Sequence, residues 1–289
     1  RAAAALGAKE SKRSVAALAK ALQRDPHYAV RMAAADALGK LQTDEAFAVL
    51  AGSLDPSPLR QPSARVRQRV VMRLGDFYRP DAEAALVRVA RDEPNPGVAA
   101  QAVKALGLFQ TDAARAAIEA ALAKPSLHER YARLAFEAAE RRGDPALLPA
   151  VVAAIDRRGE RYGSRTWTAA LTAVARLAAT GGDKTAAREA IVARLDHPKP
   201  PVRIAAIKAL GELRDPTTLA LVRACTGDAN NRMARAAEAA AKQIEAEAAY
   251  VPEELNQLRK LVRELQADQK KLRQSVERLE SKADAAAGG

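Results

Sequence analysis

Six closely spaced arginines and three widely spaced histidines are the residues of this sequence best suited to chemistry. Guanidinium groups bind phosphates and carboxylates, so a group of arginines is typical of a contact with an anionic partner such as nucleic acid. From Arg65, three further arginines follow two, four and eight residues later, which places them on more than one helix face. The candidate contact with an anion or a partner protein therefore consists of Arg60, Arg65, Arg67, Arg69 and Arg73, with Arg79 nearby.

The histidines and the lone cysteine do not form a recognisable metal or catalytic motif. His27, His128 and His197 are far apart in the sequence, and Cys225 has no second cysteine with which to form an internal disulfide. His-Glu-x-x-His, Gly-x-x-x-x-Gly-Lys-Ser/Thr, Gly-x-Ser-x-Gly and Cys-x-x-Cys are all absent from the sequence, which removes the common signatures of zinc, nucleotide and hydrolase sites. We expect the histidines to cap helices, and we expect no catalytic, cofactor or metal residue in this stretch.

Length and composition indicate a soluble, all-helical protein. The 289 residues are 48% hydrophobic, mostly alanine and leucine, and only 3% aromatic, and β-branched residues never run together as in a buried strand. The net charge of +12 would suit an anionic partner, although arginine spread along helices often only solvates them. No stretch approaches the roughly 20 apolar residues that span a bilayer, and no signal peptide is recognisable. These features do not assign a compartment.

A repeated pattern organises most of the chain. Early copies of the dipeptide Leu-Gly lie 32 to 36 residues apart, and the copies are Leu6-Gly7, Leu38-Gly39, Leu74-Gly75, Leu106-Gly107 and Leu210-Gly211. Eight positions before the last four leucines the residue is always valine: Val30, Val66, Val98 and Val202. Tyr131 and Trp167 can fill the same position in the long gap before Leu210. Units of this length cannot bury an apolar face alone, so neighbouring units must stack.

Each copy contains the pattern of two helices. One face of the first helix gathers Val30, Ala34, Ala37, Leu38 and Leu41, and one face of the second gathers Ala46, Val49, Leu50 and Leu54. Thr43 can cap the second helix, and prolines such as Pro26 and Pro56 mark the boundaries between copies. The predicted fold class is all-α, a right-handed α-α superhelix over residues 1–250 with about seven to eight helical repeats. A protein or peptide partner is expected on its concave face.

The last part of the chain has the heptad pattern of a coiled coil. Leucines at d positions are Leu258, Leu265, Leu272 and Leu279, and the a positions are Leu255, Val262, Gln269 and Val276. Leucine at d with valine and one glutamine at a favours a parallel two-stranded coil. We predict a homodimer through residues 251–283 and disorder in residues 284–289. The alternative is that the helix folds back and caps the last repeat.

The repeats resemble HEAT repeats of the family that includes the phycobilisome-lyase type, over about residues 1 to 248. More narrowly, Asp25-Pro-His-Tyr-Ala-Val-Arg31 and Tyr162-Gly-Ser-Arg-Thr-Trp167 resemble the C-terminal solenoid of bacterial zinc aminopeptidases of the aminopeptidase N type. In that family aromatic residues usually follow Asp-Pro, and His27 departs from the pattern. The coiled coil is not expected from that family either.

The resemblance implies that this stretch is a non-catalytic domain, and that the zinc site and exopeptidase motif lie upstream of Arg1. The sequence begins with Arg1 and not with methionine, which fits the expectation of a longer protein. Two other functions remain open: a stand-alone scaffold that dimerises through its tail, and, third, a basic nucleic-acid binder similar to HEAT-like DNA glycosylases.

Overall fold

The computed structural model describes residues 12–55, 60–125, 129–179, 183–250, 258, 260–266, 268–269 and 272–273. These residues form helices and short connections, with no strand among them. The α-helices are α2 (Lys12–Arg24), α3 (Tyr28–Leu41), α4 (Asp44–Gly52), α5 (Ala64–Leu74), α6 (Pro80–Asp92), α7 (Pro96–Leu106), α8 (Asp112–Ala123), α9 (Arg130–Arg142), α10 (Leu148–Arg158), α11 (Ser164–Ala179), α12 (Thr185–Val192), α13 (Pro200–Leu213), α14 (Leu219–Ala224) and α15 (Asn231–Tyr250). The predicted all-α fold is confirmed.

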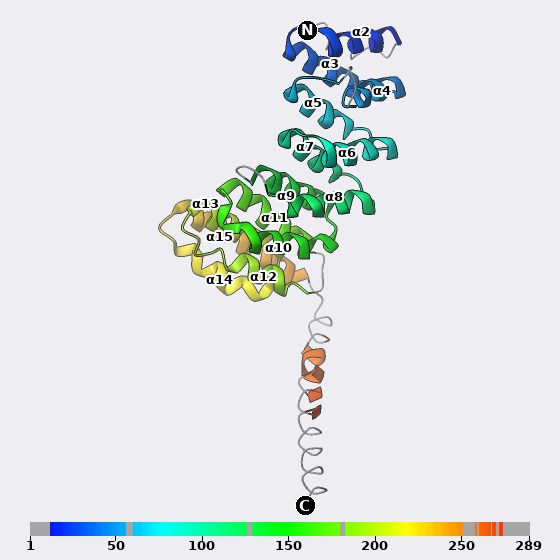
Figure 1. Ribbon diagram of the computed structural model, residues 1–289. Coiled ribbons are helices and arrows are strands. Elements are labelled where there is room, and N and C mark those ends of the chain that lie inside the picture. The colour runs from blue at the N-terminus through cyan, green and yellow to red at the C-terminus, as the bar shows by residue number, and fades with distance from the viewer. Residues whose placement is uncertain are drawn as a thin grey trace, which may run out of the picture.

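The helices stack in two layers (Figure 1). The odd-numbered layer contains α3, α5, α7, α9, α11, α13 and α15, each packed on the next. The even-numbered layer contains α2, α4, α6, α8, α10 and α12, and its neighbours contact one another at fewer places. The short helix α14 packs against α15. The chain therefore zigzags between the layers and forms the predicted solenoid.

Side-chain caps start several of the helices, and one of them is the threonine cap that the sequence predicts. Thr43 accepts a hydrogen bond from the backbone amide of Ala46 at the start of α4, as expected for a threonine N-cap. Asp144 and Asp215 each cap a short 3₁₀ turn, η2 (Pro145–Leu147) and η4 (Pro216–Thr218), which leads into the next even-numbered helix. These two Asp-Pro pairs therefore occupy equivalent places in their repeats.

The Leu-Gly dipeptide lies where neighbouring helices of the odd-numbered layer pack tightly. Its leucines are fully buried in every described copy: Leu38, Leu74, Leu106 and Leu210. A Cβ atom on Gly107 would lie 2.8 Å from the Cα atom of Ala138, and one on Gly211 would lie 2.8 Å from the Cα atom of Ala240. Only glycine leaves room for such backbone contact. The odd-numbered helices can therefore pack backbone against backbone at these points.

The residues predicted for the valine position in the middle repeats lie in the core. Tyr131 is 2% exposed and Trp167 is 3% exposed, so their large rings fill space between helices. Val30 differs from the other valines because 38% of its surface is exposed. A residue's periodicity assigns it to a helix face, but does not say how far a neighbouring helix reaches along that face.

Candidate functional site

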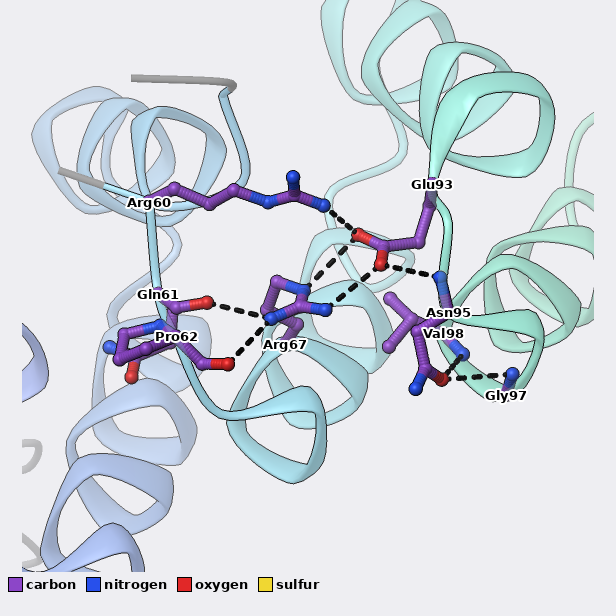
Figure 2. A network of polar contacts seen from close by, with 8 residues as sticks. All are labelled: Arg60, Gln61, Pro62, Arg67, Glu93, Asn95, Gly97 and Val98. Atoms are coloured by element: carbon purple, nitrogen blue, oxygen red, sulfur yellow. Dashed lines mark hydrogen bonds and ion pairs between the residues drawn. The ribbon is translucent and has the colours of Figure 1, made fainter. Parts of the chain in front are cut away.

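The arginine cluster is built around a buried ion pair between Arg67 and Glu93 (Figure 2). Arg67 lies on α5, and Glu93 follows α6. The guanidinium of Arg67 donates to both carboxylate oxygens of Glu93 over 2.9 and 3.1 Å. Its remaining Nη1 donates to the backbone carbonyls of Gln61 and Pro62, both over 2.9 Å. The side chain thus ties the segment before α5 to the end of α6.

Glu93 is the centre of this network. Arg60 donates to it over 2.7 Å, and the backbone amide of Asn95 donates over 3.0 Å. Burial alone would raise the pKa of Glu93, but the hydrogen bonds from Arg67, Asn95 and Arg60 outweigh burial and hold the pKa below its ordinary value. Glu93 therefore stays ionised and balances two of the five candidate arginines.

The other arginines of the cluster turn to different partners. Arg69 and Arg73 both lie within ion-pair distance of Asp36 on α3, at 3.5 and 3.3 Å. Arg65 is exposed and lies over the ring of Tyr28, 5.6 Å from its centroid. The structure thus brings Arg60 and Arg67 together and directs Arg65, Arg69 and Arg73 elsewhere. Most of their charge is balanced within the fold, which favours a structural role for them.

Ion pairs of this kind recur along the odd-numbered layer. Lys104 on α7 pairs with Glu137 on α9 over 2.6 Å. Arg176 on α11 lies between Glu140 on α9 and Glu212 on α13, at 2.6 and 3.1 Å. These side chains are partly exposed, so each pair contributes little stability on its own. Together they give the surface of this layer alternating charges of both signs.

A groove with an apolar floor separates two helices of the even-numbered layer. This α6–α8 groove has a volume of about 440 Å³ and is lined by Val87, Ala90, Arg91, Ala113, Ala116, Ala117, Ala120, Ala121, Lys124 and Tyr131. It continues toward the start of α6 into a second hollow of about 520 Å³, which shares Val87, Arg91 and Ala113. The phenol of Tyr131 closes the floor by donating to the carbonyl of Ala90 over 2.9 Å.

The sequence reasoning missed this groove, although a signal for it exists. The core stripe of α8 includes Ala114, Ile118 and Leu122, which are fully buried. A second stripe at helical spacing, Ala113, Ala116, Ala117 and Ala120, lies on a more exposed face. Small side chains on a face that does not enter the core would have marked the helix surface where α8 leaves space beside it.

Two of the three histidines can be placed. His27 caps α3, since its Nδ1 accepts from the amide of Ala29 over 3.2 Å, as predicted. His197 accepts from the amide of Lys199 and packs edge-on against Trp167, with ring centroids 5.8 Å apart. His128 lies outside the described residues. Within the described ranges, no three metal-ligating side chains gather at one point.

The tail residues that the structure describes are helical and exposed. Leu258, Val262, Leu265 and Leu272 are 46 to 66% exposed, and Gln269 is also exposed. They belong to the predicted a and d positions. The other predicted positions, Leu255, Val276 and Leu279, lie outside the described residues, as does the segment 284–289. The tail therefore presents an apolar stripe that nothing in this chain covers at the described positions.

The comparison with protein-family models identifies the repeat class. The family model of HEAT repeats matches residues 1–61, 57–138 and 159–242. A search of curated proteins finds no match. Among the described residues, no helix is both long enough and apolar enough to cross a membrane.

The solved structures that match this chain include three proteins. Human deoxyhypusine hydroxylase has a TM-score of 0.37 at 19% identity, covering 84% of this chain and 99% of that one. The complex of CpcE and CpcF of phycocyanin lyase from Nostoc sp. PCC7120 has a TM-score of 0.49 at 21% identity, covering 66% and 74%. A designed armadillo repeat protein has a TM-score of 0.43 at 14% identity, covering 80% and 99%. With the family model matching most of its length, the chain belongs to the HEAT-repeat family.

Proposed function

We propose that this chain is a non-catalytic HEAT-repeat scaffold that dimerises through its tail and holds a protein partner on its solenoid. The observation that carries the proposal is the exposed apolar stripe of the tail helix. Leu258, Leu265 and Leu272 recur every seven residues and are 62 to 66% exposed. Solvent-exposed leucines at this heptad spacing are typical of a coiled-coil interface, which a second helix would cover.

A second copy of the same tail is the partner that best fits this stripe. Leucine at d and valine at a, as at Leu265 and Val262, favour two parallel strands. Gln269, at a central a position, pairs best with the same residue of an identical strand, because a buried polar group needs a polar partner. A parallel dimer would also place both solenoids at one end of the coil, where two partner-binding surfaces act together.

The concave surface is the proposed site for the protein partner of the solenoid. A two-layer stack bends toward the layer whose helices lie closer together, and the backbone contacts at Gly107 and Gly211 support the odd-numbered layer as the concave one. Its surface carries the alternating ion pairs of Lys104 and Arg176 described above. A partner with alternating charges could exchange these pairs with its own, at small net cost because they are partly exposed.

The test is the oligomeric state of the intact chain and of two tail variants. Leu265→Glu puts a charge into the seam and is expected to give a monomer, measured by light scattering after gel filtration. The matched control is Lys260→Glu, which introduces the same side chain at an f position that faces away from the seam. The dimer proposal fails if the intact chain is monomeric, or if both variants behave alike.

A second candidate function is the C-terminal solenoid of a zinc aminopeptidase, supported by the resemblance around Asp25–Arg31 and Tyr162–Trp167. In the structure the first segment stabilises a repeat boundary, because Arg31 donates to the carbonyl of Asp25 over 2.6 Å. In the second, the rings of Tyr162 and Trp167 pack edge to face. Zinc would then belong to a catalytic domain upstream of Arg1. Intact mass and peptide mapping of the endogenous protein test this candidate, since it requires a much heavier chain containing His-Glu-x-x-His.

The third function is nucleic-acid binding through the arginines between Arg60 and Arg73. The ion pairs that Asp36 and Glu93 make with these arginines argue against it, because they already balance the positive charge. Binding of that kind would fall steeply with salt, because it releases counterions from the phosphate backbone. A titration of duplex DNA at two salt concentrations checks it, and the scaffold proposal expects no salt-dependent binding.

A further inference from the structure

The α6–α8 groove lies between two neighbouring helices of the even-numbered layer. We call such a helix–helix boundary a seam, and this one lacks the polar bridge, an ion pair or hydrogen bond, that joins the helices at the seams on either side. At the preceding seam, Arg88 of α6 pairs with Asp55, just after α4. At the following seam, Arg158 of α10 donates to the carbonyls of Leu122 and Ala123 of α8. Among the described residues, no hydrogen bond or ion pair joins the C-terminal halves of α6 and α8.

The repeat spacing shows which residues have changed at this seam. Leu86 and Ile118 hold the same core position of α6 and α8, 32 residues apart. By that offset, Ala120 stands where Arg88 stands in the preceding helix. By the 36-residue offset between Leu50 and Leu86, Arg91 stands where Asp55 stands. Asp55 and Arg88 thus form an ion pair at the α4–α6 seam. The equivalent residues at the α6–α8 seam are Arg91 and Ala120, which cannot pair, and the groove stays open.

The same change gives the groove a basic rim. Arg91 turns to its exposed neighbour Asp92, and the ammonium of Lys124 lies over the ring of Tyr131, 5.1 Å from its centroid. Lys124 has no carboxylate partner among the described residues. Both cations flank an apolar floor that includes Val87 and Ala117. An occupant that fits must therefore combine an apolar face with negative charge.

We propose that the α6–α8 groove binds an amphipathic helix of a partner protein, with its apolar face on the alanines and a carboxylate near Arg91 and Lys124. The alanines of α8 let a third helix approach closely, in the way that small residues do at helix interfaces. The 12 residues of α8 extend for about 18 Å, so the groove accommodates about three turns of such a helix. The carboxylate of the partner helix supplies the negative charge that Asp55 supplies at the preceding seam.

Synthetic helical peptides test the proposal on the intact chain. The probe is a fluorescein-labelled peptide of four turns, with leucines on one face and glutamates beside them, and the comparison peptide has lysines in place of the glutamates. We expect the acidic probe to bind at least about tenfold more tightly than the basic one, measured by fluorescence anisotropy. The groove proposal does not depend on the tail, so Leu265→Glu should leave the binding unchanged.

Two variants assign the binding to the groove. Ala120→Glu restores an acid–arginine pair across the seam, with Arg91, and repels the probe; it should weaken binding at least about tenfold. Ala123→Glu adds the same charge to an exposed position of α8 that does not line the groove, and should leave binding unchanged. Circular dichroism confirms that both variants are folded. Equal binding of the two peptides, equal effects of the two variants, or no saturable binding at all would overturn the proposal.

Discussion

Gly107, which directly follows α7, lies against Ala138 of α9, so closely that a Cβ atom on Gly107 would be 2.6 Å from the carbonyl oxygen of Ala138. Gly107 itself has an ordinary φ of −60°, so glycine is needed here for space and not for backbone conformation. The contact explains why glycine follows the buried leucine in the repeat. It also makes this position sensitive to a single added methyl group.

Gly107→Ala is therefore expected to destabilise the solenoid by about 1–3 kcal/mol, because the methyl group forces two backbones apart. Gly52, in the last turn of α4, is the matched control, since nothing lies within 4 Å of a Cβ built there. Gly52→Ala should be neutral or stabilising by up to about 1 kcal/mol. Urea denaturation of both variants measures the difference. Equal stability of the two would show that the helices separate without cost.

Glu93→Gln is expected to destabilise the fold at neutral pH by about 3 kcal/mol, because Arg67 would be left buried without its carboxylate. The pKa of Glu93 is lower in the fold than in the unfolded chain. Its contribution is therefore complete above about pH 4.3, the ordinary value, and is lost as the pH falls through the folded pKa. The gap between wild type and variant should shrink in acid.

Denaturation curves at pH 7 and at progressively lower pH test this prediction. Asp92→Asn is the control, since Asp92 is the neighbouring residue but its ion pair with Arg91 is exposed. That substitution should change stability little at pH 7. A Glu93→Gln gap that stayed constant with pH would mean that the carboxylate charge is not what stabilises the seam.

The single tryptophan of the chain is expected to report the protonation of His197. The two rings lie 5.8 Å apart, and a protonated imidazole quenches indole fluorescence at such contact. Burial, helped by the positive charges of Lys199 and Arg194, lowers the pKa of His197 from its ordinary value of 6.5. As the pH is lowered, emission from Trp167 should therefore fall, with a midpoint below pH 6.5. His197→Gln should abolish the transition, and its persistence would assign it to another group.

Much of the solenoid follows from the sequence because its determinants are local. Thr43 caps α4 through the amide of a residue only three positions later, and the spacing from Val98 to Leu106 lies within one helix. The partners of the arginine cluster are not local in this sense. Arg67 finds Glu93 26 residues later, after the second helix of its repeat, and only the packing of the helices against one another brings the two together.

The alanine stripe of α8 marks one wall of the groove in the sequence, but the groove as a whole does not follow from the sequence, for a related reason. It depends on what α6 and α8 lack at facing positions, Ala120 in one helix and Arg91 in the other. Periodicity assigns each residue to a face of its own helix, whereas a groove is a property of the space between two helices. Once the structure had paired the helices, the repeat offsets identified the missing bridge.

The molar mass of the intact chain in solution, by sedimentation equilibrium over a range of concentrations, tests the scaffold proposal most directly. We expect twice the mass of one chain for the intact protein and for Lys260→Glu, and the mass of a single chain for Leu265→Glu. A single-chain mass at every concentration would contradict it, because the exposed stripe of Leu258, Leu265 and Leu272 would then have no second strand to cover it.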